Sequence, residues 1–214
     1  MLVGTWREKL NDLLAPGAAA TAPAPARNTR ASLGIEQFLG VLADAPHPSV
    51  LDLGCVWQAT VSFFTQAGCK LYTEDIFQAL YQARAESRPK SPPLAERFLP
   101  AVLKYPDEHF RGILAWDLFD YLPEETVNPL AGRLFDLLEP GGALLGLFHN
   151  RTEGEAFTRY RVLDVHTLEL LPGSLMLPME RAYPNRALLN LFAAFRSSRT
   201  FVGRDNLREL FLVK

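Results

Sequence analysis

The feature that most constrains the fold is a regular alternation of strand-like and helix-like segments between residues 49 and 150. The strand-like segments are short and apolar, whereas the helix-like segments carry apolar residues at helical spacing. The strand-like segments cover residues 49–53, 70–75, 110–117 and 143–150, and the helix-like segments cover residues 59–68, 76–87 and 128–138. This alternation predicts an α/β fold, in which a parallel sheet carries helices on both faces.

Two segments within this pattern call for a specific interpretation. Residues 96–103 are ambiguous, and a short third strand is one interpretation of them. Pro129 lies inside a helical pattern, and we predict that the helix begins there, with Asn128 as its cap. A proline is well tolerated as the first residue of a helix, because its missing N–H has no helical partner at that position.

The C-terminal part of the chain departs from the alternation. A helix is predicted over residues 185–196, followed by two strands over 199–203 and 207–214. The turn between these strands is too short for a crossover, so they must be antiparallel.

The N-terminal part divides into an appendage, a linker and the start of the domain. Residues 1–14 are predicted to contain one short amphipathic helix, whose apolar face holds Trp6, Leu10, Leu13 and Leu14. Residues 15–30 are rich in Ala and Pro and are typical of a linker, and the domain is predicted to span residues 31–214. This N-terminal helix is either loosely held or docked on the domain, on a second copy or on a partner protein. The domain is predicted to begin with a helix over residues 32–45, with Ser32 as its N-cap.

Composition excludes several classes of function. The chain has 214 residues and a formal net charge of -2, which does not favour nucleic acid as a partner. No apolar segment is long enough to cross a bilayer, and the charged first residues are unlike a signal peptide. Cys55 and Cys69 are best interpreted as reduced thiols of a cytoplasmic protein. The four histidines are scattered, so no metal site is predicted.

Four stretches, taken in order, resemble the class I S-adenosylmethionine-dependent methyltransferases. They are "VLDLGC", "GCKLYTED", "LKYPDEHFRGILAWDLFDYL" and "LFDLLEPGGALLGLF". The resemblance covers roughly residues 35 to 214, and the combination is more specific than any one stretch. It implies a Rossmann-like fold with a mostly parallel seven-stranded sheet, helices on both faces and a C-terminal antiparallel hairpin. It also implies S-adenosylmethionine as the cofactor.

The first strand and its loop carry one set of implied cofactor residues. Asp52 and Gly54 correspond to the residues that flank the methionine end of the cofactor, and Cys55 and Trp57 continue the same loop. A second set lies after the next strand, where Asp75, or its neighbour Glu74, is expected to accept hydrogen bonds from the ribose hydroxyls. Independently of the family, a carboxylate at this edge of an open α/β sheet lies beside the ligand crevice. Asp75 is also placed to cap the helix that follows.

The chain departs from the family pattern around this site. The second and third loop glycines are replaced by Val56 and Gln58, and the indole of Trp57 between them either fills the crevice or turns outward. The acidic residue that faces the adenine has no clear counterpart among residues 98–101, and Arg111 replaces the family's aspartate. The cofactor site is therefore changed while the core pattern is kept.

Candidates for methyl-transfer chemistry follow the last two strands of the alternation. Asp117 and Tyr121 follow one strand, and His149 ends the next. His149 is the best candidate for a general base, although it equally fits a polar cap on a buried strand. Asp117 is expected to contact substrate or cofactor, or to cap the next turn.

Residues 151–181 are expected to form a flap over the crevice, with a hairpin near residues 159–173. Its aromatic residues either line an acceptor pocket or pack the flap onto the domain; they are Phe157, Tyr160 and Tyr183. Two functions remain open. The chain transfers a methyl group to an unidentified small molecule or protein, or it is a catalytically silent methyltransferase-fold protein that serves as a binding or assembly module.

Overall fold

A computed structural model of the chain describes residues 28–88, 90–152, 156–203 and 205–214. The predicted N-terminal helix and most of the predicted linker lie outside the described residues. The last residues of that linker are described, and they form strand β1 (Thr29–Ala31). Strand β1 thus includes the last two residues of the predicted linker.

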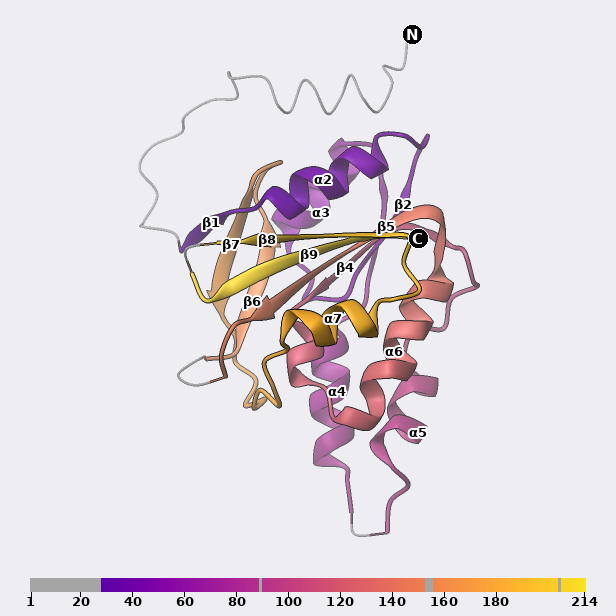
Figure 1. The fold of residues 1–214 in the computed structure, drawn as a ribbon, viewed down its shortest axis with the longest axis vertical. Helices are drawn as coiled ribbons and strands as arrows, with labels where there is room; N and C mark the ends of the chain where they lie inside the picture. Colours follow the sequence, from indigo (N-terminus) through magenta and orange to yellow (C-terminus); the bar gives the residue numbers. More distant parts are fainter. Residues whose placement is uncertain (1–27, 89, 153–155, 204) are drawn as a thin grey trace, which may run out of the picture.

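A six-stranded sheet forms the centre of the fold, in the order β3-β2-β4-β5-β9-β8 (Figure 1). Its strands are β2 (Ser49–Asp52), β3 (Lys70–Thr73), β4 (Phe110–Trp116), β5 (Leu138–His149), β8 (Ser197–Val202) and β9 (Leu207–Val213). Four neighbouring strands, β3, β2, β4 and β5, run parallel to one another. Strand β9 is antiparallel to both β5 and β8. The predicted parallel sheet and C-terminal antiparallel hairpin are confirmed.

Helices lie on both faces of this sheet (Figure 1). They are α2 (Leu33–Leu42), α3 (Gln58–Gln66), α4 (Ile76–Ala85), α5 (Leu94–Phe98), α6 (Glu124–Leu137) and α7 (Asn185–Leu191). Ser32 caps α2 as predicted, because its hydroxyl accepts a hydrogen bond from the backbone N–H of Ile35 at 3.1 Å. Helix α2 packs so closely on β4 that a Cβ at Gly112 would lie 2.5 Å from the Phe38 ring. No helix among the described residues has both the length and the apolarity needed to cross a membrane.

The short third strand considered for residues 96–103 does not form, so the sheet has six strands rather than the seven expected. The segment in question folds instead as α5 and a 3₁₀ turn over Leu99–Ala101. Pro100 lacks the N–H that a strand would donate to its neighbour, which favours the helical alternative. Strand β3 is left at the edge of the sheet, where Tyr105 and His109 pack against the ring of Tyr72.

The start of α6 also differs from the prediction. The helix begins at Glu124, and Pro129 lies inside it rather than at its first position. The missing N–H of Pro129 costs one helical hydrogen bond. The added turn buries Thr126 and Val127, and this burial offsets the loss. Helix α7 ends at Leu191, five residues before the predicted end at residue 196.

A second, three-stranded antiparallel sheet has the order β1-β7-β6. Strands β6 (Thr158–Val162) and β7 (Thr167–Pro172) form the hairpin that the sequence predicts within the flap. The backbone N–H of Val162 donates to the hydroxyl of Thr60 on α3 at 3.1 Å, so the hairpin is bonded directly to the main domain. Together the two sheets define the region in which the candidate residues lie.

Candidate functional site

The predicted cofactor residues meet at the carboxyl edge of the central sheet. Strands β2, β3 and β4 are parallel neighbours, and Asp52 pairs in register with Thr73 on one side and Leu114 on the other. Asp52, Asp75 and Asp117 therefore follow adjacent strand ends, where open α/β sheets place their ligand crevice. The structure thus brings these three strand ends together at one edge of the sheet.

Asp52 is held by two hydrogen bonds from its own chain. Its Oδ1 accepts one from the backbone N–H of Gly54 at 2.9 Å and one from the indole Nε1–H of Trp116 at 2.6 Å. The carboxylate is only 2% exposed. Burial raises the pKa of Asp52 to about 6, while the two hydrogen bonds oppose the rise.

The indole of Trp116 occupies the space above Gly54. A Cβ at Gly54 would lie 2.7 Å from the Trp116 Nε1, so the glycine is required by the indole. Trp116 has φ +50°, a conformation that is uncommon for a bulky residue and costs free energy. The hydrogen bond to Asp52 and the burial of the ring offset this cost. The bare backbone that would face a cofactor thus faces a tryptophan.

Asp75 has two partners within the chain. Its Oδ1 accepts a hydrogen bond from the N–H of Gln78 at 3.0 Å, which confirms the predicted cap of α4. The same oxygen lies 2.8 Å from Nη1 of Arg159 on strand β6. The guanidinium also lies over the rings of Phe77 and Phe157, with 5.6 and 5.0 Å to the ring centroids. A guanidinium thus occupies the position expected for the ribose hydroxyls.

Glu74, the alternative ribose ligand, points to a different part of the fold. Its carboxylate accepts a hydrogen bond from the backbone N–H of Leu103 at 3.0 Å. This contact ties the end of β3 to the segment that replaces the missing strand, so Glu74 has a structural role in this arrangement.

Tyr160, the residue after Arg159, closes the middle of the crevice. Its ring stacks on Trp116 with the centroids 5.6 Å apart and the planes 11° from parallel. Its hydroxyl donates to Oδ2 of Asp117 at 3.0 Å, and the residue is 4% exposed. The hairpin therefore inserts a ring and a guanidinium between the ends of the strands.

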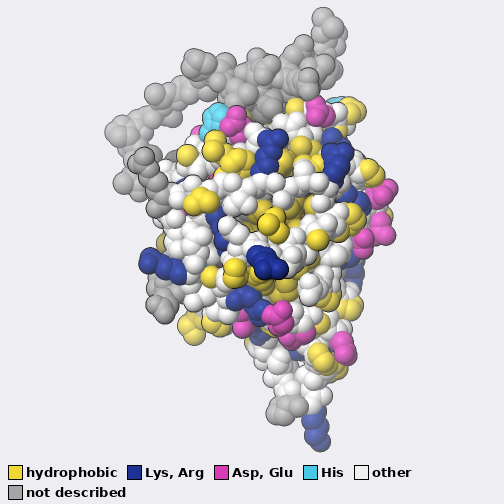
Figure 2. Space-filling model, in the orientation of Figure 1, with side chains coloured by type: hydrophobic (Ala, Val, Ile, Leu, Met, Phe, Trp, Pro, Cys, Tyr) yellow, Lys and Arg dark blue, Asp and Glu magenta, His cyan; other side chains and the backbone are white. Residues whose placement is uncertain are grey.

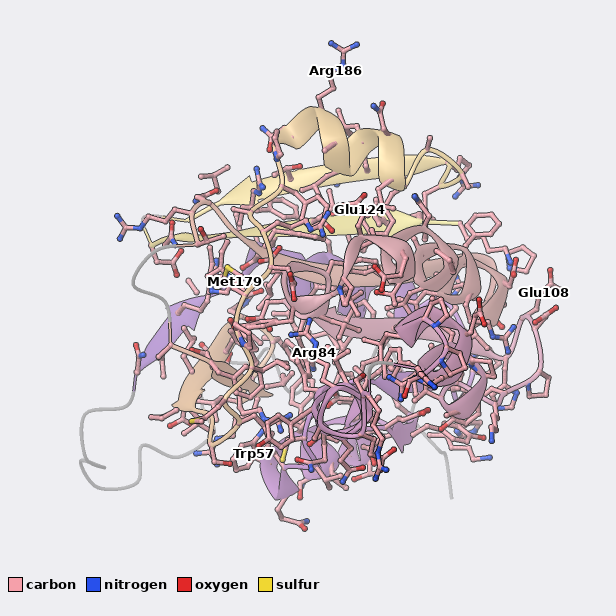
Figure 3. All side chains as sticks on the ribbon, turned by 90° about the horizontal axis from the view of Figure 1, so that it is seen from below. Trp57, Arg84, Glu108, Glu124, Met179 and Arg186 are labelled. Carbon is pink, nitrogen blue, oxygen red and sulfur yellow. The ribbon has the colours of Figure 1, made fainter. Side chains whose placement is uncertain are left out.

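The loop residues Cys55 and Trp57 lie beside this closed region rather than inside it. Both are half-buried, and the Trp57 ring lies 5.6 Å from the guanidinium of Arg161 on β6. Figure 3 shows Trp57 towards the outside of the molecule. The sequence suggested that this indole either fills the crevice or turns outward. In the structure Trp57 packs on the hairpin, and Trp116 and Tyr160 fill the crevice.

The candidate general base belongs to a buried polar cluster. Nδ1 of His149 lies 3.0 Å from Oδ2 of Asp120 and 3.9 Å from Oδ2 of Asp117, and the backbone N–H of His149 donates to Asp120 at 2.7 Å. His149 is 2% exposed and both aspartates are fully buried. Burial raises the pKa of Asp117 to about 7, which His149 opposes and Asp120 reinforces. The cluster matches a buried structural network. No cluster of metal-ligating side chains occurs in the described part of the chain.

The remaining candidates pack the flap onto the domain. The ring of Tyr121, 1% exposed, contacts the edges of Phe77 and Phe157, and the ring of Tyr183 contacts Phe148. Arg84 strengthens this packing by donating to the carbonyl of Tyr121 and pairing with Glu180 of the flap. Of the two roles that the sequence left open for the flap aromatics, the structure supports packing.

The side chains present do not fit S-adenosylmethionine in this arrangement. A cofactor needs the surface of Gly54, the carboxylate of Asp75 and the space between them. Trp116 covers the glycine, Arg159 pairs with the carboxylate, and Tyr160 fills the space between them. Sequence analysis missed Trp116 and Arg159. Two features of the sequence pointed to them. One is a bulky residue directly before Asp117 at the end of a strand, and the other is a basic residue in the alternating pattern of the flap.

Comparisons with known proteins found similar solved structures but no relative by sequence. No protein-family model matches the sequence, and no curated protein matches it. Many solved structures of methyltransferases are similar to it. One is the 1,6-didemethyltoxoflavin-N1-methyltransferase of Burkholderia thailandensis, with 16% identity, a TM-score of 0.47, and coverage of 84% of this chain and 76% of that one. Another is an S-adenosylmethionine-dependent methyltransferase of Archaeoglobus fulgidus, with 12% identity, a TM-score of 0.48, and coverage of 84% and 93%.

Human N-acetylserotonin methyltransferase, crystallised with S-adenosylmethionine, is also similar. Its identity to this chain is 13%, the TM-score is 0.44, and the match covers 85% of this chain and 52% of the human one. A shared fold does not determine activity, because one fold carries many unrelated functions. The chain is thus similar in fold to S-adenosylmethionine-dependent methyltransferases, with a six-stranded mixed sheet.

Proposed function

We propose that this chain is a methyltransferase-like protein that does not transfer methyl groups and that serves as a binding or assembly module. One observation carries the proposal: strand β6 places Arg159 on Asp75 and Tyr160 on Trp116, within the crevice where a cofactor would bind. The chain's own side chains satisfy the two carboxylates that the cofactor would need.

The energetics of these contacts support a stable closure. Asp52 is buried and Asp75 is partly buried, and the carboxylate of each is already hydrogen-bonded. A cofactor would have to displace Arg159 and Tyr160 and leave a partly buried guanidinium without its carboxylate. Breaking this partly buried ion pair costs about 1–2 kcal/mol, and this cost would be subtracted from the affinity.

The competing function is methyl transfer with S-adenosylmethionine. It is favoured by the retained carboxylates at the ends of β2 and β3, and it requires the hairpin to leave the crevice. The candidate base of that chemistry, His149, is buried between Asp117 and Asp120.

Calorimetric titration with S-adenosylmethionine and with S-adenosylhomocysteine tests the proposal. We expect no binding heat at millimolar ligand, with an active methyltransferase as the positive control. Micromolar binding that Asp75→Ala abolishes would overturn the proposal and support methyl transfer, because it would show that the hairpin yields to the cofactor.

A further inference from the structure

Strand β8 forms one edge of the central sheet (Figure 1). It pairs with β9 on one side, and on its other side it pairs with no strand in the described part of the chain. Five of its six residues are exposed. Proteins commonly protect such an edge with proline or with several charges, but β8 contains no proline and its only charged residue is Arg199. The backbone of this edge is therefore open to pairing with another strand.

The hydrogen bonds of β9 determine which backbone groups of β8 point outward. Just beyond the two ends of the β5–β9 ladder, the N–H of Asn150 donates to the carbonyl of Asn206, and the N–H of Lys214 donates to the carbonyl of Gly142. In an antiparallel sheet the backbone groups of successive residues point alternately to the two neighbouring strands. The even-numbered residues of β9 therefore bond to β5, and its odd-numbered residues bond to β8.

The register between the two last strands carries this alternation to the edge. Arg199 of β8 lies opposite Phe211 of β9, so the odd-numbered residues of β8 bond to β9. The N–H and C=O groups of the even-numbered residues, Ser198, Thr200 and Val202, consequently point to the open side.

This edge is self-complementary when two copies pair antiparallel about a twofold axis at Thr200. Thr200 then exchanges both backbone hydrogen bonds with its own copy, and Ser198 exchanges them with Val202 on either side of the axis, so the outward groups of all three residues find partners. Arg199 lies opposite the ring of Phe201 of the second copy, which attracts a cation. An axis at Arg199 would instead place two guanidinium groups opposite each other, so charge favours the axis at Thr200.

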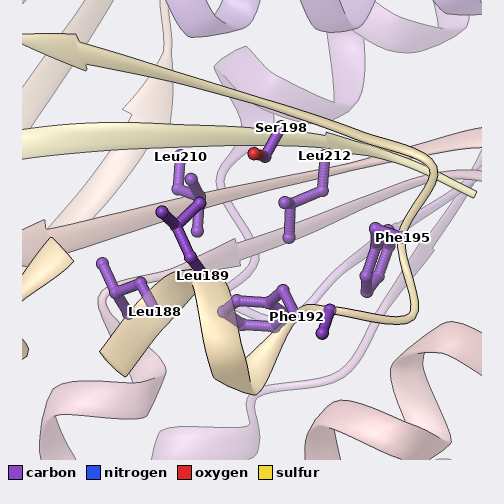
Figure 4. Close-up of a pocket in the computed structure, with 8 residues that line it drawn as sticks. Leu188, Leu189, Phe192, Phe195, Ser198, Leu210 and Leu212 are labelled. Atoms are coloured by element: carbon purple, nitrogen blue, oxygen red, sulfur yellow. The ribbon is translucent and has the colours of Figure 1, made fainter. Parts of the chain in front are cut away.

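Exposed apolar side chains flank the edge on the face that carries α7. Leu189 of α7 lines the same pocket as Ser198 of β8 (Figure 4), and this leucine is 54% exposed. Val202 lies on the same face of β8 as Ser198, because alternate residues of a strand share a face, and it is 72% exposed. Figure 2 shows further apolar side chains at the surface of this side of the molecule. In the symmetric pairing Val202 of the second copy lies opposite Ser198 and therefore beside Leu189, which removes both apolar side chains from water.

We propose that two copies of this chain pair through the β8 edge, antiparallel and centred on Thr200, and so form one continuous sheet. The proposal rests on the assembly function proposed above and deepens it by naming the partner, a second copy of the chain. The N-terminal part of the same chain is less suited to this edge. Residues 1–14 are predicted to contain a helix, and the linker contains Pro16, Pro23 and Pro25, which lack the N–H that a paired strand donates.

Sedimentation equilibrium of the full chain, from micromolar to near-millimolar concentration, tests the proposal. We expect a monomer–dimer equilibrium with a Kd in the micromolar range, because one strand pair with two apolar flanks is a small interface. Thr200→Lys places two ammonium groups opposite each other at the axis, and Thr200→Glu places two carboxylates there. Each variant alone should weaken dimerisation by about tenfold or more. The control Met176→Lys adds the same charge at an 85% exposed site outside β8 and should leave the Kd unchanged.

An equimolar mixture of the two Thr200 variants provides the second arm. It should restore a dimer that contains one copy of each, because only the register centred on Thr200 places this residue opposite itself. The rescue also shows that both variants are folded, since an unfolded chain offers no edge to pair with. A mixture that stays monomeric would overturn the proposal, as would a wild-type chain that is monomeric at every concentration.

Two other outcomes would also overturn it. A dimer that Thr200→Lys leaves as stable as Met176→Lys does would use another surface. A dimer that forms only after residues 1–27 are deleted would show that the N-terminal part of the chain occupies the edge. The cofactor titration remains a separate readout. Cofactor binding by a chain that still dimerises would refute the silent function alone, whereas a monomer that binds no cofactor would refute the edge pairing alone.

Discussion

The ion pair between Arg159 and Asp75 should contribute measurably to the stability of the fold. Its atoms lie 2.8 Å apart, and the side chains are 11% and 26% exposed, so the pair is screened less than a surface pair. Exposed pairs contribute about 0–1 kcal/mol, and breaking a fully buried pair costs about 3–5 kcal/mol. We therefore expect a coupling energy of about 1–2 kcal/mol for this intermediate case.

A double-mutant cycle with Arg159→Met and Asp75→Asn isolates this energy. Asparagine keeps the cap on α4, because its side-chain oxygen still accepts from Gln78. Arg159→Met also loses the contacts with the rings of Phe77 and Phe157, so the single variant should lose about 2 kcal/mol in all. For a domain of this size, that loss lowers Tm by roughly 4–8 °C. Urea unfolding of the four proteins gives the coupling.

The control cycle uses Arg133 and Asp107, an ion pair whose side chains are 31% and 69% exposed. This surface pair should show a coupling of about 0.5 kcal/mol or less. If the Arg159–Asp75 coupling were no larger than that of the control, the guanidinium would not hold the hairpin in the crevice. The closure of the crevice would then have no electrostatic basis.

Three other changes test the packing at the strand ends. Trp116→Phe removes the indole donor from the buried carboxylate of Asp52 and should cost about 1–3 kcal/mol in urea unfolding; an unchanged midpoint would show that the bond contributes nothing. Gly54→Ala should lower the free energy of unfolding by about 1–3 kcal/mol, because the added Cβ would lie 2.7 Å from the indole of Trp116. The control Gly132→Ala has no atom within 4 Å of its added Cβ, so it should leave that free energy unchanged or raise it by up to about 1 kcal/mol. Burial raises the pKa of Asp117 to about 7, so between about pH 4 and 7 the folded protein binds more protons than the unfolded chain and loses stability as pH rises. The stability of Asp117→Asn relative to wild type should therefore increase by about 2 kcal/mol from pH 5 to pH 8, and a constant difference would contradict the raised pKa.

Local sequence pattern was sufficient for most elements of the fold. The strands at residues 49–53 and 110–117 and the cap at Ser32 were predicted because they depend on residues close in sequence. Two of the errors in the central domain involve prolines, Pro100 and Pro129, whose effect depends on what the neighbouring segment buries. A proline restricts the backbone locally, but it does not determine whether a helix continues through it.

The sequence by itself determined the α/β class, the parallel sheet with its antiparallel end, and the gathering of Asp52, Asp75 and Asp117 at one edge. Only the tertiary structure decided what fills that edge. Trp116 reaches Asp52 across 64 residues, and Arg159 reaches Asp75 across 84. Periodicity fixes the face of an element on which a side chain lies, because that depends on local backbone geometry. Which side chain of a distant hairpin enters a crevice depends on how two sheets pack together, and no local pattern encodes that contact.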